Sequence, residues 1–244
     1  MKSSIEELEN RGFIAVGIEQ KYPDASFEQR TELLKSNLPC ERALGARLLG
    51  NYPDLKAIDC LINALKKEKK LYSKIEICNS LVSFGKDAVV PLIHLLGKIG
   101  NNQHVDIPET SFKKNSYPLP RDIAARTLIR IGATALPDLV AGLGSNDLSM
   151  LSELTDTIGF ICFYEPQPYL LEPLKDCFYR NEQHDVIKWK IIRAMSAFPE
   201  SRSFLEGQQE QEDNARLKSE IERSLSSIGS SFSWRAKKEN SNRL

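Results

Sequence analysis

The sequence predicts an all-α protein, an α-α superhelix of about six stacked helical pairs. Three observations lead to this prediction. Amphipathic segments recur along the chain, each with apolar residues at helical spacing. Each segment carries a small residue at the same place, and a second amphipathic segment follows it after a short turn. We expect every pair to bury one face of each helix against its neighbours.

The residue that closes each predicted first helix serves as a register mark. The marks are separated by 35, 47, 32, 35 and 30 residues, and they are Gly50, Gly85, Gly132, Tyr164, Pro199 and Gly229. The residues one and four positions before each mark are apolar, which gives one stripe of a helix. The residue five positions before each mark is always small, so a neighbouring helix can approach closely there.

The second helix of a pair is predicted to begin a few residues after the mark. Asp87 and Thr134 have side-chain oxygens that can cap a helix N-terminus, so we expect them to be N-caps. Pro91 and Pro137 then fall in the first turn, where a missing N–H costs little.

Composition limits the classes of function. The 33 basic and 33 acidic residues give a formal net charge of zero, which argues against a surface built mainly for nucleic acid. The five cysteines form no CxxC pair and are odd in number, so we expect neither a zinc site nor a disulfide framework. No apolar run approaches the roughly 20 residues of a membrane span, and the N-terminus lacks an export signal. We therefore expect a cytoplasmic protein with no membrane contact.

Three regions are expected along the chain. Residues 1–39 contain two helical segments, SIEELENRGFIAVGIEQ and SFEQRTELLKSN, and form an N-terminal cap. Residues 40–229 form the repeat array, interrupted by an inserted loop at 100–120. Residues 230–244 have little to bury except Phe232 and Trp234, so we expect a mobile tail.

The segments "ERALGARLLG", "RDIAARTLIRIG" and "ALPDLVAGL" resemble HEAT repeats, in particular the bacterial kind found in phycobilisome lyases. The resemblance covers roughly residues 40–229 and rests on packing positions. It implies a HEAT/armadillo-like solenoid with a concave groove, where a partner protein binds. We expect this groove to be built from second helices and edged by the 100–120 loop. Because fold alone does not assign activity, the resemblance implies no reaction.

The inserted loop, GNNQHVDIPETSFKKNSYPLP, has no helical period and holds three prolines. A loop of this length in a compact domain is often functional. Our candidate residues for contact with a partner protein come from this loop and the helix after it: Phe112, Lys113, Tyr117, Arg121 and Arg126. A surface insertion without function is the alternative.

The competing class is an enzyme on a HEAT-like scaffold. Deoxyhypusine hydroxylases of this kind bind iron through paired His-Glu motifs, but His94, His104 and His184 stand apart and form no such motif. No phosphate loop or nucleophile motif is present either. We therefore assign no catalytic residue, no metal and no cofactor, and we favour a non-catalytic scaffold that binds another protein over a lyase-like enzyme.

A second enzyme class, the HEAT-like alkylpurine DNA glycosylases, would need cations along one face. Arg126, Arg193 and Arg223 all lie six positions before a register mark and would form such a ladder. However, Glu153 and Asp156 lie in the intervening pair, so solvated arginines or ion pairing between repeats is the alternative, and we do not expect nucleic-acid binding.

Two further features leave alternatives open. The run 66–70, KKEKK, ends a predicted second helix, where cations interact favourably with the helix dipole; an acidic partner is the other explanation. Trp189 is either exposed as a contact residue for a partner or packed against the neighbouring helix.

Overall fold

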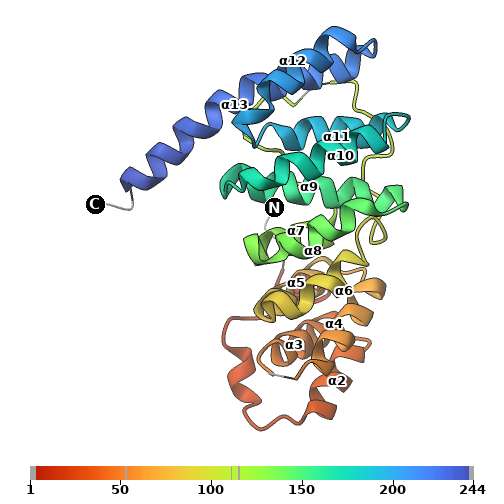
Figure 1. Cartoon of the computed structure of the whole chain (residues 1–244). Helices are drawn as coiled ribbons and strands as arrows, with labels where there is room; N and C mark the ends of the chain where they lie inside the picture. Colours follow the sequence, from red (N-terminus) through yellow and green to blue (C-terminus); the bar gives the residue numbers. More distant parts are fainter. Residues whose placement is uncertain (1–3, 53, 111, 115, 242–244) are drawn as a thin grey trace. The chain divides into compact units, whose positions relative to one another are not determined.

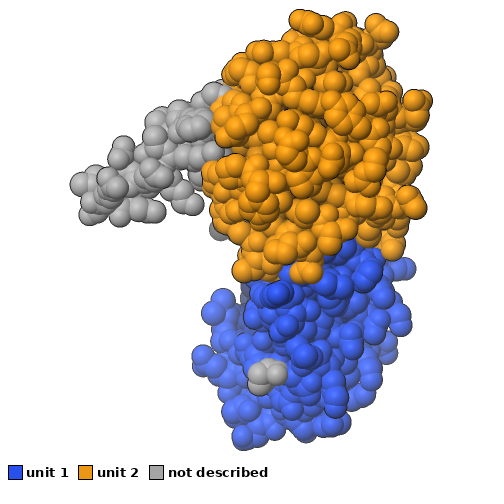
Figure 2. Space-filling view, viewed as in Figure 1, with its two compact units in different colours: residues 1–95 blue, residues 96–244 orange. Residues whose placement is uncertain are grey.

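The computed structural model describes residues 4–52, 54–110, 112–114 and 116–241, with the backbone alone described for 229–241. The described residues form α-helices, short 3-10 turns and loops, and no strand is found among them. The fold class is therefore all-α, as predicted. The chain divides into two compact units, Met1–Leu95 and Leu96–Leu244 (Figure 2).

Unit 1 contains six α-helices among its described residues: α1 (Ile5–Glu9), α2 (Phe27–Lys35), α3 (Pro39–Gly50), α4 (Lys56–Lys67), α5 (Leu71–Ser83) and α6 (Val89–Ile93) (Figure 1). The first helix of one pair, α3, packs against the first helix of the next, α5, and also against α2. Buried leucines and isoleucines of α3, α4 and α5 form the core. A 3-10 turn, η2 (Gly85–Ala88), leads from α5 into α6.

The first predicted helix of the N-terminal cap is interrupted. The segment forms only α1 and a 3-10 turn, η1 (Ile18–Lys21), while α2 forms as expected. The backbone turns at Gly12, where φ is +91°, and a Cβ there would collide with Ser73 of α5. Arg11 then accepts a hydrogen bond from the backbone N–H of Tyr72 at 3.0 Å, so close contact with α5 replaces the helix.

In unit 2, the inserted loop leads into two short helices, α7 (Ile123–Ile131) and α8 (Leu136–Ala141), which are separated by the turn η3 (Gly132–Ala135). Longer helices follow: α9 (Leu148–Tyr164), α10 (Leu171–Arg180), α11 (Asp185–Met195), α12 (Arg202–Gln211) and α13 (Ala215–Ser241) (Figure 1). First helices again pack on first helices, α7 on α9, α9 on α11 and α11 on α13.

The small position of the sequence register lies where neighbouring first helices pack. All six residues of the small position, five before each mark, are buried: Gly45, Ser80, Thr127, Gly159, Ala194 and Ser224. At Gly159 the neighbouring helix is so close that a Cβ would lie 2.8 Å from the Cα of Ala194. The prediction of close approach at this position is confirmed there.

The sixth mark does not end a helix. Gly229 lies inside α13, which continues to Ser241, and no second helix follows it in the described chain. The expected sixth pair is therefore a single helix. The backbone of the predicted tail is helical up to Ser241, whereas its side chains, including those of Phe232 and Trp234, lie outside the described residues.

The predicted N-caps of the second helices are also wrong. Asp87 and Thr134 lie inside the 3-10 turns η2 and η3, and the Thr134 hydroxyl donates backwards to the Ile131 carbonyl at 3.2 Å. The prolines lie in the first turns of α6 and α8, as expected. Side-chain caps are found instead on the first helices α7 and α9, from Asp122 and Asp147.

Residues Ile123–Gly144 have the length and mean hydropathy, 1.2, of a candidate membrane span. In the structure this stretch turns sharply at Gly132, where φ is +82°, and forms α7 and α8 rather than one straight helix. Its apolar residues Leu128, Leu136 and Leu139 are buried inside the unit. Core packing therefore accounts for the buried part of this stretch, which is 33% of the candidate window.

Candidate functional site

The inserted loop packs against the first helices of unit 2. The ring of Tyr117 contacts Phe160 and Phe163 of α9, with centroid distances of 5.9 and 5.8 Å. Gly159 makes room for it, because a Cβ there would collide with the Tyr117 hydroxyl. We expected this loop to border a groove built from second helices. That expectation is wrong, because the loop buries its side chains on α9, α11 and α13.

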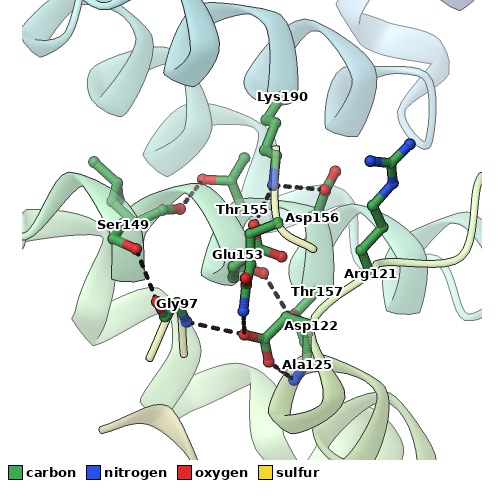
Figure 3. Close-up of polar contacts among 12 residues, drawn as sticks. Gly97, Arg121, Asp122, Ala125, Ser149, Glu153, Thr155, Asp156, Thr157 and Lys190 are labelled. Carbon is green, nitrogen blue, oxygen red and sulfur yellow. Dashed lines mark hydrogen bonds and ion pairs between the residues drawn. The ribbon is translucent and has the colours of Figure 1, made fainter. Parts of the chain in front are cut away.

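Asp122 fixes the loop at both of its ends. Its carboxylate is fully buried, and Oδ1 accepts the backbone N–H of Ala125 at 3.0 Å, which caps α7. Oδ2 accepts the backbone N–H of Gly97 at 3.0 Å and the side-chain amide of Gln103 at 2.9 Å (Figure 3). One side chain thus joins the segment before the loop, the start of the loop and the helix after it.

A cluster of buried ions lies beneath the loop. Three successive first helices each contribute two charged side chains three positions apart: Glu153 and Asp156 of α9, Lys190 and Arg193 of α11, Glu220 and Arg223 of α13. The Lys190 ammonium lies 2.6 Å from Glu153 and 3.0 Å from Asp156 (Figure 3). Arg193 lies 3.7 Å from Asp156 and 3.5 Å from Glu220, and Arg223 lies 2.6 Å from Glu220.

Trp189 of α11 packs against these buried ions. Its indole N–H donates to Glu220 at 2.9 Å, and the Arg193 guanidinium lies 3.8 Å from the ring centroid. The imidazole of His104, from the loop, meets the indole edge on at 5.0 Å. Trp189 is only 3% exposed, so of the two explanations that the sequence left open, packing is confirmed.

Burial sets the electrostatics of the cluster. It raises the pKa of Glu153, since Lys190 offsets only part of the desolvation of that carboxyl. Burial alone would lower the pKa of Arg193, but Asp156 and Glu220 outweigh it and raise that pKa. Burial, with the nearby charge of Arg121, lowers the pKa of His104 to about 4, so this imidazole is neutral at neutral pH.

A pocket of about 580 Å³ opens between the loop and the three helices; we call it the loop pocket. Its floor is formed by the buried side chains of Asp156, Trp189, Arg193 and Glu220. Its wall is apolar and comes from the loop: Ile107, Pro108, Phe112, Pro118, Leu119 and Pro120. Lys113, Arg121 and Arg216 add three cationic side chains to the lining.

Only some of the five predicted contact residues lie in the loop pocket. Phe112, Lys113 and Arg121 line the loop pocket. Tyr117 is 3% exposed and anchors the loop instead. Arg126 is exposed and donates to the Pro120 carbonyl at 2.6 Å, and it does not line the pocket. The sequence therefore located three of the pocket residues and two residues that hold or border its loop.

Of the predicted arginine ladder, Arg193 forms ion pairs with neighbouring first helices, whereas Arg223 pairs within its own helix, α13. Arg193 and Arg223 converge on Glu220, and Arg193 also faces Asp156 on the preceding first helix. Pairing between repeats, one alternative explanation of the ladder, is confirmed for Arg193 alone. Both arginines form part of a cluster in which three carboxylates balance three cations.

Sequence reasoning missed Lys190 and Glu220 as site residues. Lys190 and Arg193 lie nine and six positions before one register mark, and Glu220 and Arg223 lie nine and six before the next. Charged residues repeated at the same register on adjacent repeats were the available signal. A single charged residue does not indicate a buried site, because charged residues are rarely fully buried.

In the part of the chain that the structure describes, no three His, Cys, Asp or Glu side chains are grouped to hold a metal ion. The five cysteines are free thiols, and Cys78, Cys162 and Cys177 are buried. Burial raises the pKa of Cys177, which keeps it protonated and poorly nucleophilic at neutral pH.

In comparison with known proteins, the chain matches no protein-family model and none of the curated sequences.

Proposed function

We propose that this chain is a non-catalytic protein-binding module of the cytoplasm, which holds a segment of a partner protein in the loop pocket. The observation that carries this proposal is the pocket's chemistry. The lining combines an apolar wall that includes Phe112 with the cations Lys113 and Arg121 and one acid, Glu109, over a preformed floor. Interfaces commonly combine an aromatic centre with arginine in this way.

The partner segment is expected to carry an apolar side chain next to a carboxylate. Among the described residues, no carboxylate lies within ion-pair distance of Lys113 or Arg121, so both can engage an acidic group from outside. Arg216 is engaged with Asp106 at 3.2 Å and with the Ile107 carbonyl at 2.9 Å, which holds the loop rather than a ligand. Exposed cations at a rim guide and orient a charged partner.

The floor supports binding because it is already organised. Asp156, Arg193 and Glu220 are buried and paired with one another, so a ligand need not order them. Preorganisation lowers the entropy cost of association. The HEAT-like solenoid is part of the same proposal, and the stacking of first helix on first helix within each unit supports it.

The test compares two double variants of the full chain. Phe112→Ala with Arg121→Ala removes the apolar wall and one free cation. Lys114→Ala with Tyr169→Ala changes one cation and one aromatic residue that are exposed and do not line the pocket. Proteins captured from cytosol by each variant are identified by mass spectrometry, and the dissociation constant of a purified partner is then measured by calorimetry.

We expect the pocket variant to weaken binding by about thirtyfold or more, the effect of losing one interface hot spot, and the control to change it by less than about threefold. Equal binding by both variants would contradict the proposal. Duplex DNA binding that weakens steeply with salt would instead support the nucleic-acid class.

A further inference from the structure

A second pocket, of about 630 Å³, lies in unit 1 at the end of α4; we call it the lysine pocket. It gathers side chains from α2, α3, α4 and the turn into α5. Leu34, Cys60 and Ala64 give it an apolar part, and Lys67, Lys69 and Lys70 give it three cations. These lysines belong to the charged run that the sequence left with two explanations.

The one acid of this run, Glu68, is used inside the fold. Its carboxylate receives two hydrogen bonds from the Arg42 guanidinium, at 2.7 and 3.0 Å. It also accepts the backbone N–H groups of Lys69 and Lys70, at 2.9 and 2.8 Å. Glu68 is only 8% exposed, so it does not neutralise the lysine ammonium groups around it.

The lysines of the run are exposed and unengaged. Among the described residues, no carboxylate lies within ion-pair distance of Lys66, Lys67, Lys69 or Lys70, and all four are exposed. The first turn of α5, which follows them, contains no acidic residue. The lysine pocket therefore has an excess of positive charge that the described part of the protein does not balance.

The helix dipole accounts for only two of the four lysines in the run 66–70. Lys66 and Lys67 lie in the last turn of α4, where a cation is favourable. Lys70 is the residue before α5 and Lys69 precedes it, so both stand at a helix N-terminus, where a cation is unfavourable. The helix dipole therefore does not account for these two cations.

We propose that the lysine pocket binds an acidic peptide segment of a partner protein that carries one apolar anchor residue. Complementary charge selects the acidic residues, and the apolar surface of Leu34 and Ala64 accepts the anchor. A peptide fits better than nucleic acid, because the cations occupy one turn, whereas a nucleic acid backbone is followed by an extended basic groove. This site lies in unit 1 and is independent of the loop pocket.

The experiment measures binding of synthetic peptides to the full chain by fluorescence anisotropy. The probes are labelled peptides of about 12 residues that contain either several glutamates with one leucine, the same glutamates without leucine, or matched glutamines with the leucine. Short duplex DNA and vesicles of anionic lipid are measured beside them. The variant is Lys67→Glu, Lys69→Glu, Lys70→Glu, and the matched control is Lys56→Glu, Lys74→Glu, Lys86→Glu, which changes the charge of unit 1 equally outside the pocket.

We expect the acidic peptide with leucine to bind, and the pocket variant to weaken it by about tenfold or more, while the control changes it by less than about threefold. Removing either the glutamates or the leucine should also weaken binding. Equal losses in variant and control, or no peptide binding at low salt, would overturn the proposal. Tighter binding of DNA or vesicles that the pocket variant abolishes would assign the surface to those ligands instead. Circular dichroism of both variants establishes that the fold is retained.

Discussion

The contact between first helices is built differently in the two units. In unit 1, α3 and α5 meet through hydroxyl groups and one partly exposed ion pair: Ser80 donates to the Ala46 carbonyl at 2.8 Å, Ser83 donates to the Gly50 carbonyl at 2.8 Å, and Arg47 pairs with Glu76 at 2.7 Å. In unit 2, α9 and α11 meet through Lys190, Glu153 and Asp156, with all three side chains 3% exposed or less. The small position of the register is buried in both contacts.

The difference shows that the same packing register can place different polar groups between first helices: serine hydroxyls in unit 1 and buried charged side chains in unit 2. A serine hydroxyl satisfies a neighbouring carbonyl at little desolvation cost. A buried ammonium between two carboxylates loses most of its hydration, and replacement of such clusters by apolar residues is often neutral or stabilising. The buried charged cluster, which has the higher desolvation cost, lies directly beneath the loop pocket, where its fixed charges orient Trp189 and Arg193. This placement favours a role in the site over a role in stability alone.

Breaking the charged contact should have the largest effect. Lys190→Met leaves Glu153 without its cation and Asp156 with only the more distant Arg193, and we expect a loss of about 3–5 kcal/mol in the free energy of unfolding. Urea denaturation followed by tryptophan fluorescence measures it in unit 2. The matched change in unit 1 is Arg47→Met, which breaks the partly exposed pairs with Glu76 and Glu19 and the hydrogen bond to the Ala15 carbonyl, and it should cost about 1–2 kcal/mol.

A second substitution separates lost pairing from lost packing. Adding Glu153→Gln to Lys190→Met removes a carboxylate that has become unpaired, so it should recover part of the stability. If the double variant is no more stable than Lys190→Met, the loss in the free energy of unfolding comes from packing rather than from an unpaired carboxylate. That result would contradict the contrast drawn between the two units.

The next effect concerns the small position itself. Gly159→Ala places a methyl group against Tyr117 and against Ala194 of α11, so we expect a loss of about 1–3 kcal/mol from overpacking. Gly207→Ala in α12 is the control, since nothing lies within 4 Å of the added carbon. That change should stabilise the helix by up to about 1 kcal/mol. Thermal unfolding of both variants by circular dichroism would show opposite shifts, and shifts of the same sign would contradict close approach at Gly159.

The smallest effect is a difference in pH dependence. The pKa of Glu153 is raised from 4.5 by burial, so its contribution to stability is lost as pH rises above 4.5. Burial also acts on Glu68, but Arg42 and two backbone N–H groups outweigh it and lower that pKa, so its contribution is lost as pH falls below 4.5. Relative to the unsubstituted protein, Glu153→Gln should therefore gain stability as pH rises and Glu68→Gln should lose it. Urea denaturation from about pH 3.5 to about pH 7 measures both slopes, and slopes of the same sign would refute the contrast.

The apolar stripe made the fold predictable from the sequence. Gly45, Ser80 and Gly159 share one register, and helical periodicity alone places them at the contact between neighbouring helices. The second helices were less predictable, because η2 and η3 precede α6 and α8 and displace the expected caps by a few residues. The cap over the first repeat was misjudged because the close approach of Gly12 to Ser73 is a tertiary contact without local signal.

The candidate site was predictable only in its exposed part. Phe112, Lys113 and Arg121 were found because an insertion without helical period is conspicuous. Tyr117 was assigned to the surface because its partner, the gap above Gly159, exists only after folding. The buried ions were not assigned to the site because a single charged residue predicts exposure, and only the repeat of Lys190 and Glu220 on adjacent helices indicates otherwise.

The hydrogen bond from Arg216 to the Ile107 carbonyl joins residues 109 positions apart. Most links between adjacent repeats in unit 2 span far less, as between Lys190 and Glu153, which are 37 positions apart. In a simple repeat array, folding can start anywhere and spread from neighbour to neighbour. The inserted loop closes unit 2 from its beginning to its last helix, so its repeats cannot fold one after another without also completing this long-range contact. Unit 2 is therefore expected to unfold as one cooperative body, and to fold more slowly than its helical content alone would imply.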